Sequence, residues 1–99
     1  MILGSHDGIA EVLSRSLSQN GIVLTEQELA PAFFDLSTRI AGELFQKIMN
    51  YHSRLDIVIA DPASYGQRFS ELVYEHRDHA HIRFFNDPID AEHWLTANR

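Results

Sequence analysis

Residues 33–51 read FFDLSTRIAGELFQKIMNY, and the rest of the chain is organised around this stretch. An aromatic pair precedes a helix start, where Asp35 or Ser37 can accept hydrogen bonds from the free N–H groups of the first turn. Apolar side chains then recur at the spacing of one helical face. That face comprises Ile40, Ala41, Leu44, Phe45, Ile48 and Tyr51. The stretch predicts an amphipathic helix over residues 36–51 that packs against the core.

The opposite face of this helix holds the densest set of candidate binding residues. The set comprises Glu43, Gln46, Lys47 and Asn50. Glu43 precedes Lys47 by four residues, an order that favours a surface ion pair worth about 0.2–0.5 kcal/mol. The face can bind a partner, can hold an acid/base pair if Lys47 is desolvated, or can be an ordinary solvated surface. Gly42 costs about 1 kcal/mol against alanine in mid-helix, which predicts that another backbone packs closely against it.

The composition limits which classes of protein this chain can belong to. Its 99 residues make one small domain spanning residues 1–99, and its net charge of −6 argues against nucleic-acid binding through phosphate contacts. The absence of cysteine excludes disulfides and thiolate metal sites. No apolar run reaches the roughly 18–20 residues of a membrane span, and the N-terminus lacks the basic and apolar regions of a signal peptide. We therefore expect a cytoplasmic protein that binds neither nucleic acid nor membrane.

Helices and strands alternate along the chain. Apolar runs predict buried strands over residues 22–25, 55–60 and 81–85. Asn20-Gly21 ends a first helix, and Asp61-Pro62 and Asp87-Pro88 each begin one. The core-facing stripe of the first helix comprises Ile9, Val12, Leu13 and Leu17. This order predicts an α/β fold with a small, mainly parallel sheet of three or four strands packed with helices.

Two other clusters are candidate metal sites. His76, His79 and His81, with Asp78, have a spacing that can hold a metal, although histidines in polar turns are mostly solvated. Asp35, Asp61 and Asp87 belong at or near the edge where parallel strands end, the usual place for ligands, yet each is explained as a helix N-cap. The chain has no glycine-rich phosphate loop and no Gly-x-Ser-x-Gly elbow. We assign no catalytic residue, metal ligand or cofactor.

Several of these motifs resemble the signature of DUF4180, a bacterial family of domains of unknown function. The central motifs are Phe33-Phe34-Asp35-Leu36, Ala41-Gly42-Glu43, Gln46-Lys47 and Asn50-Tyr51. The later ones are Val58-Ile59-Ala60-Asp61, Tyr65, Tyr74-Glu75 and Phe84-Phe85. The family pattern is similar to the fold of sulfate transporter and anti-sigma-factor antagonist (STAS) domains, small α/β domains that generally bind partners. The resemblance implies an interaction or regulatory role.

The chain departs from the family pattern in two places. Relatives usually carry a pair of strands before the first helix, whereas here we expect the first helix to follow almost directly from the start of the sequence. Where they tend to show Ser-Asn-Arg-Gly, this chain has His76-Arg77-Asp78-His79. In anti-sigma-factor antagonists a serine near the comparable helix start is phosphorylated, so the resemblance makes Ser37 and Thr38 candidate phosphorylation sites, with plain capping as the alternative.

These patterns lead to three functional expectations. The first is a non-enzymatic interaction module using the start and polar face of the central helix. The alternative is a small-molecule-binding or catalytic domain that uses the strand-end rim with Glu43, Lys47 and Tyr65. The third is a homodimer, formed either through a sheet edge or residues 1–3 or through helices, since a short sheet leaves unpaired edges. The competing expectation is a monomer in which residues 1–3 supply an edge strand of their own. The candidate partner- or ligand-binding residues are Asp35, Ser37, Thr38, Glu43, Gln46, Lys47, Asn50, Tyr51, Asp61 and Tyr65.

Overall fold

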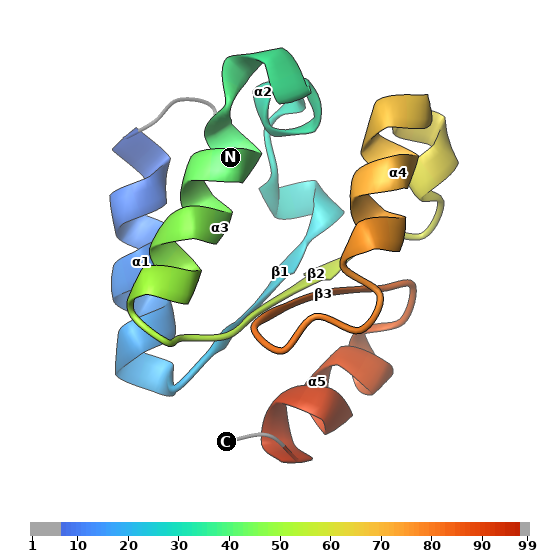
Figure 1. Cartoon of the computed structure of the whole chain (residues 1–99). Helices are drawn as coiled ribbons and strands as arrows, with labels where there is room; N and C mark the ends of the chain where they lie inside the picture. The colour runs from blue at the N-terminus through green and yellow to red at the C-terminus, as the bar shows by residue number, and fades with distance from the viewer. Residues whose placement is uncertain (1–6, 98–99) are drawn as a thin grey trace.

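A computed structural model of the chain describes residues 7–97 (Figure 1). The helices of this part are α1 (Asp7–Gln19), α2 (Pro31–Phe34), α3 (Ile40–Asn50), α4 (Gln67–Glu75) and α5 (Pro88–Ala97). The strands are β1 (Ile22–Thr25), β2 (Leu55–Val58) and β3 (Ile82–Phe85). Short 3₁₀ turns occupy Glu26–Glu28, Leu36–Thr38 and Pro62–Tyr65. No helix in residues 7–97 is long and apolar enough to cross a bilayer.

The three strands form one parallel sheet in the order β1-β2-β3. Every residue of the central strand, β2, is buried, and its largely apolar run predicted a parallel strand covered on at least one face. The predicted α/β class and parallel sheet are therefore confirmed, with three strands in the described part of the chain. The second and third strands are shorter than predicted, since β2 ends at Val58 and β3 begins at Ile82.

Helices cover the two faces of the sheet unequally. Helices α1, α3 and α4 lie on one face, and α5 lies alone on the other (Figure 1). The ring of Phe84 contacts both Phe45 of α3 and Phe69 of α4, with centroid separations of 6.1 and 5.9 Å. On the opposite face the ring of Phe85 lies 6.2 Å from that of Trp94 in α5. Most of the core therefore fills the three-helix side.

The helix ends follow the predicted chemistry at three places. Asn20 adopts a left-handed conformation after α1, and the N–H of Gly21 donates to the carbonyl of Ser16 at 2.8 Å, which closes the helix end. A carboxylate oxygen of Asp61 accepts from the N–H of Ala63, and one of Asp87 accepts from the N–H of Ile89. Asp61, however, begins a 3₁₀ turn, and α4 starts only after Gly66.

The central helix differs from the prediction at both ends. It begins at Ile40, after the 3₁₀ turn Leu36–Thr38 and a left-handed residue, Arg39, with φ 64°. Asp35 therefore caps the 3₁₀ turn and does not cap α3. Tyr51 follows the last turn and is 57% exposed, so its place on the apolar face was wrong. Tyr51 is the C-cap of α3, so it lies past the last residue whose position the helical periodicity fixes.

Two packing predictions also failed. Leu17 is 45% exposed, and Ser16 takes the buried place on α1, where its hydroxyl donates to the carbonyl of Leu13 and accepts from the hydroxyl of Ser53. Gly42 faces open space, because a Cβ built there would meet no atom within 4 Å. No backbone of the described chain packs against Gly42.

Candidate functional site

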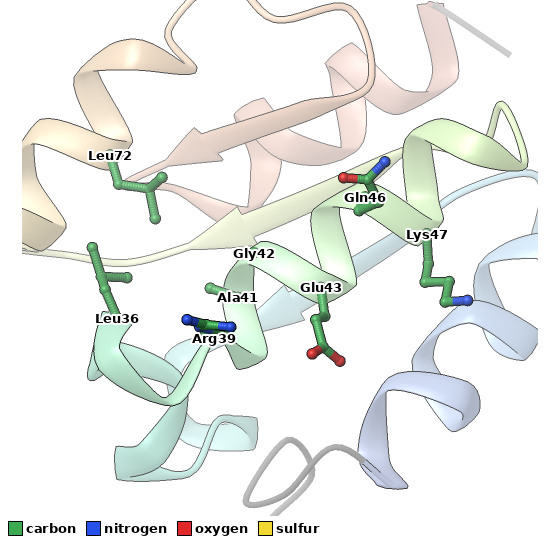
Figure 2. A pocket seen from close by; sticks show the side chains of 8 residues that line it. All are labelled: Leu36, Arg39, Ala41, Gly42, Glu43, Gln46, Lys47 and Leu72. Atoms are coloured by element: carbon green, nitrogen blue, oxygen red, sulfur yellow. The ribbon is translucent and has the colours of Figure 1, made fainter.

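An open hollow of about 610 Å³ lies on the surface of α3, facing α4 (Figure 2). Its lining residues are Leu36, Arg39, Ala41, Gly42, Glu43, Gln46, Lys47 and Leu72. Two smaller hollows adjoin it and share Leu36, one beside Phe34, Tyr65 and Arg68, the other beside Arg68 and Leu72. We call the three together the α3–α4 groove.

The sequence builds the floor of the groove from small and apolar residues. Leu36 comes from the 3₁₀ turn before α3, and Leu72 comes from α4; Figure 2 shows the two facing each other. Ala41 is buried at the first turn of α3, and Gly42 beside it has no side chain to fill the space. The floor is therefore apolar and is bordered by exposed backbone.

Charged and polar side chains form the rim. Glu43, Gln46 and Lys47 line the main hollow, so the structure brings these three predicted residues together. In Figure 2 the side chains of Glu43 and Lys47 extend away from Leu36 and Leu72. Arg39 lies at the start of α3 next to Leu36, a contribution to the groove that its sequence position alone did not indicate.

Asp35, Ser37 and Thr38 are bonded to one another and to nearby backbone. The hydroxyl of Ser37 donates to Asp35 Oδ1 at 2.6 Å, and the N–H of Ser37 donates to the same oxygen at 3.0 Å. These hydrogen bonds hold the pKa of Asp35 below its usual range. Thr38 Oγ1 lies 2.8 Å from the carbonyls of Ala32 and Asp35. All three side chains therefore form local hydrogen bonds that cap this turn.

Tyr65 joins the ends of two strands. Its hydroxyl donates to Glu26 Oε2, while Glu26 Oε1 accepts from the N–H of Ala60 after β2. The hydrogen bond to the Glu26 carboxylate raises the pKa of Tyr65. The Tyr65 ring stacks on Phe34 with 3.8 Å between centroids. Tyr65 lines a different hollow from Glu43 and Lys47, so the trio of the strand-end alternative does not share one hollow.

The remaining predicted residues lie apart from the groove. Asn50 is exposed in the last turn of α3, and Tyr51 lines a separate hollow with Leu17, Asn20 and His52. Asp61 bonds to its own turn at Ala63. Of the ten candidates, Glu43, Gln46 and Lys47 therefore line the main hollow, and Asp35 and Tyr65 line an adjoining one.

The side chains of His76, His79 and His81 form hydrogen bonds with backbone atoms. His79 Nδ1 accepts from the N–H groups of His81 and Ile82, at 3.0 and 3.1 Å, which anchors the start of β3. Desolvation, with smaller contributions from neighbouring charges, lowers the pKa of His79. The Nδ1 atoms of His76 and His81 lie 2.8 and 2.9 Å from backbone carbonyls. Within residues 7–97 no group of three or more His, Cys, Asp or Glu side chains is placed to hold a metal.

One unusual side chain, that of Asp56, was not identified from the sequence. Asp56, in the middle of β2, is completely buried, and neither carboxylate oxygen has a hydrogen-bond partner among the described residues. Its strand neighbours are Val23 and Arg83. Desolvation and then the charge of Glu92 raise the pKa of Asp56 to about 8, against the opposing effect of Arg83. The sequence feature that could have revealed Asp56 is an acidic residue inside an otherwise apolar strand.

Fold and groove together define a small α/β domain with an open, apolar-floored surface groove. The chain belongs to the family described as domain of unknown function DUF4180, whose model matches residues 3–95. No curated protein matches the sequence, and no solved structure matches it.

Proposed function

We propose that this protein is a non-enzymatic interaction or regulatory module that binds a protein partner through the polar face of α3 and the α3–α4 groove. The observation that carries the proposal is the shape and lining of the groove. It is open, its floor is apolar, and its rim is charged, which is the composition of a surface that buries a partner side chain and orients it with polar contacts. A bacterial origin, a cytoplasmic location and a likeness to STAS domains are part of the same proposal.

A pull-down from a cell lysate tests the proposed face. We expect the Glu43→Ala/Lys47→Ala double variant to lose at least one partner that the wild-type protein retains, because both side chains rim the groove. Asp90→Ala is the control, since Asp90 is exposed on α5, lines none of the three hollows and should leave the partner list unchanged. Identical partner lists for wild type and double variant would remove this face from consideration.

The strand-end rim remains the alternative site, for a small ligand. It is favoured by the hollow of about 480 Å³ that Asp35 and Tyr65 line together with Phe34 and Arg68. Tyr65→Phe keeps the stacked ring and removes only the hydroxyl. Loss of a small-molecule ligand from this variant, with an unchanged partner list, would favour the alternative.

We also propose a homodimer. Within residues 7–97, β1 and β3 each pair with another strand on one side only, which leaves two sheet edges available. Residues 1–3, the other contact we expected, lie outside the described residues. Light scattering after size-exclusion chromatography at micromolar concentration should give twice the 11.3 kDa of one chain. A mass of one chain with cooperative unfolding would contradict the dimer.

A further inference from the structure

We infer that the turn between α4 and β3 carries an acid-sensitive latch, in which the neutral ring of His79 holds the turn closed through two backbone hydrogen bonds and a proton on that ring opens it. We call the ring and its two hydrogen bonds the His79 latch. The turn comprises residues 76–81 and leads into β3, an edge strand of the described sheet (Figure 1). The latch belongs to a single chain, so it is independent of the proposed interaction face.

The hydrogen bonds fix the protonation state of the His79 ring. Its Nδ1 atom lies 3.0 Å from the backbone nitrogen of His81 and 3.1 Å from that of Ile82. Both backbone groups are N–H donors, so Nδ1 is the unprotonated, accepting nitrogen of a neutral imidazole. The ring hydrogen is therefore on Nε2, and a second proton can be added only at Nδ1. Because that proton would occupy the accepting site, protonation of His79 breaks both hydrogen bonds.

The two neighbouring histidines respond to a proton in the opposite way. Nδ1 of His76 lies 2.8 Å from the carbonyl oxygen of Leu72, and Nδ1 of His81 lies 2.9 Å from that of Ser53. A carbonyl only accepts, so each of these rings carries its hydrogen on Nδ1 and takes a second proton at Nε2. Their hydrogen bonds survive protonation, and a charge on His76 is favourable because it follows the last turn of α4. Of the three rings, only that of His79 loses its hydrogen bonds in acid.

The latch covers the outer edge of β3. The carbonyl of His81 accepts from the N–H of Leu55 in β2, so the backbone groups of His81 face the central strand. Successive residues of a strand direct their backbone groups to opposite edges, so the N–H of Ile82 is directed to the edge where no described strand lies. Nδ1 of His79 accepts from this N–H. Opening the latch therefore uncovers a donor on an unpaired edge, where another strand can pair.

Cationic groups surround the His79 ring. The ring centroids of His76 and His81 lie 5.1 and 6.1 Å from that of His79, and Nε of Arg83 donates to the His79 carbonyl at 2.8 Å. From the loop after α3, the ring of His52 lies 6.3 Å from that of His81. Desolvation, followed by the charges of these two neighbouring histidines and of Arg83, lowers the pKa of His79. A proton on His79 therefore adds repulsion to the loss of its hydrogen bonds.

The acid next to His79 in the chain, Asp78, is directed to solvent. Its side chain is 87% exposed and lies 3.9 Å from Nε of Arg77. Because the pKa of His79 is lower in the folded chain than the usual 6.5, the unfolded chain takes up this proton first. The stability that the latch contributes is therefore fully present above about pH 6.5 and is lost as the pH falls through the folded pKa.

Nuclear magnetic resonance of the whole chain tests the latch. Long-range ¹H–¹⁵N spectra at neutral pH should show the ring hydrogen on Nε2 of His79 and on Nδ1 of His76 and His81. Amide hydrogen exchange, corrected for the intrinsic effect of pH, should then follow the titration of His79. Protection of the Ile82 amide should fall by about tenfold as His79 becomes charged, while the amide of Ile57 in β2 stays protected.

His79→Asn is the decisive variant. Its side-chain oxygen can accept at the position of Nδ1 but cannot be protonated, so protection of Ile82 should stay within about twofold of its neutral value throughout the titration. His79→Ala should lack this protection at every pH. His93→Asn is the control, since His93 is exposed on α5, outside the turn, and its removal should leave the acid response of Ile82 as in wild type.

Two results would overturn the inference. The first is a His79 ring whose hydrogen is on Nδ1 at neutral pH. The second is an equal loss of protection at Ile82 in wild type and in His79→Asn, which would assign the acid response to other groups. The first measurement uses the wild-type protein alone, so it decides the question even if a variant fails to fold. Neither result depends on the interaction face on α3, which the pull-down tests separately.

Discussion

Gly21→Ala is expected to lower the free energy of unfolding by about 2–4 kcal/mol, from backbone strain and overpacking together. Gly21 has φ +124°, a conformation that side chains with a Cβ rarely adopt. A Cβ there would also overlap Leu95 Cδ1. Leu95 is 2% exposed and holds α5 against the sheet, so it cannot move aside without disturbing that helix. Urea denaturation followed by circular dichroism measures the loss.

Gly66 provides a control that separates strain from crowding. It has φ +101°, but a Cβ there would meet nothing within 4 Å. Gly66→Ala should therefore lose only the strain component, about 1–3 kcal/mol. The Gly21→Ala/Leu95→Ala double variant should lose less than the sum of its single variants, because shortening Leu95 removes the clash. Equal losses at Gly21 and Gly66 would show that crowding against α5 contributes nothing.

Asp56→Asn is expected to stabilise the protein at pH 8 and to change its stability little at pH 4. The pKa of Asp56 is raised from the usual 3.8 to about 8, so the folded state keeps a proton that the unfolded state loses. Wild-type stability from this group is therefore fully present below pH 4 and declines as the pH rises to about 8. Asparagine cannot ionise, and the variant should be more stable by about 4–6 kcal/mol at pH 8.

The measurement is a series of urea denaturations of wild type and Asp56→Asn between pH 4 and pH 8.5. The difference between the two proteins isolates Asp56, because every other titrating group is common to both. Glu92→Gln serves as a comparison: it removes the repulsive charge while Asp56 stays buried, so it should lower the pKa of Asp56 and recover only part of the stability at pH 8. Two stability curves that stay parallel across the series would refute a buried, protonated Asp56.

Short-range patterns predicted much of the fold. The apolar run at β2, the Asn20-Gly21 helix end and the aspartates before Ala63 and Ile89 each depend on residues within a few positions of one another. Periodicity placed Ile40, Leu44 and Ile48 in the core for the same reason. It failed for Leu17 and Tyr51, at helix ends, where a shift of one residue or the loss of one turn redirects a side chain.

By itself the sequence determined the alternation of helices and strands and the parallel sheet, because backbone propensity, capping and apolar periodicity are local properties. Three features were decided only by the tertiary structure. The space beside Gly42 is unfilled, and Leu36 and Leu72 face each other across a hollow. The carboxylate of Asp56 is buried without a hydrogen-bond partner among the described residues. Each of these depends on how elements distant in the chain pack together, and on which atoms that packing leaves unfilled or unpaired.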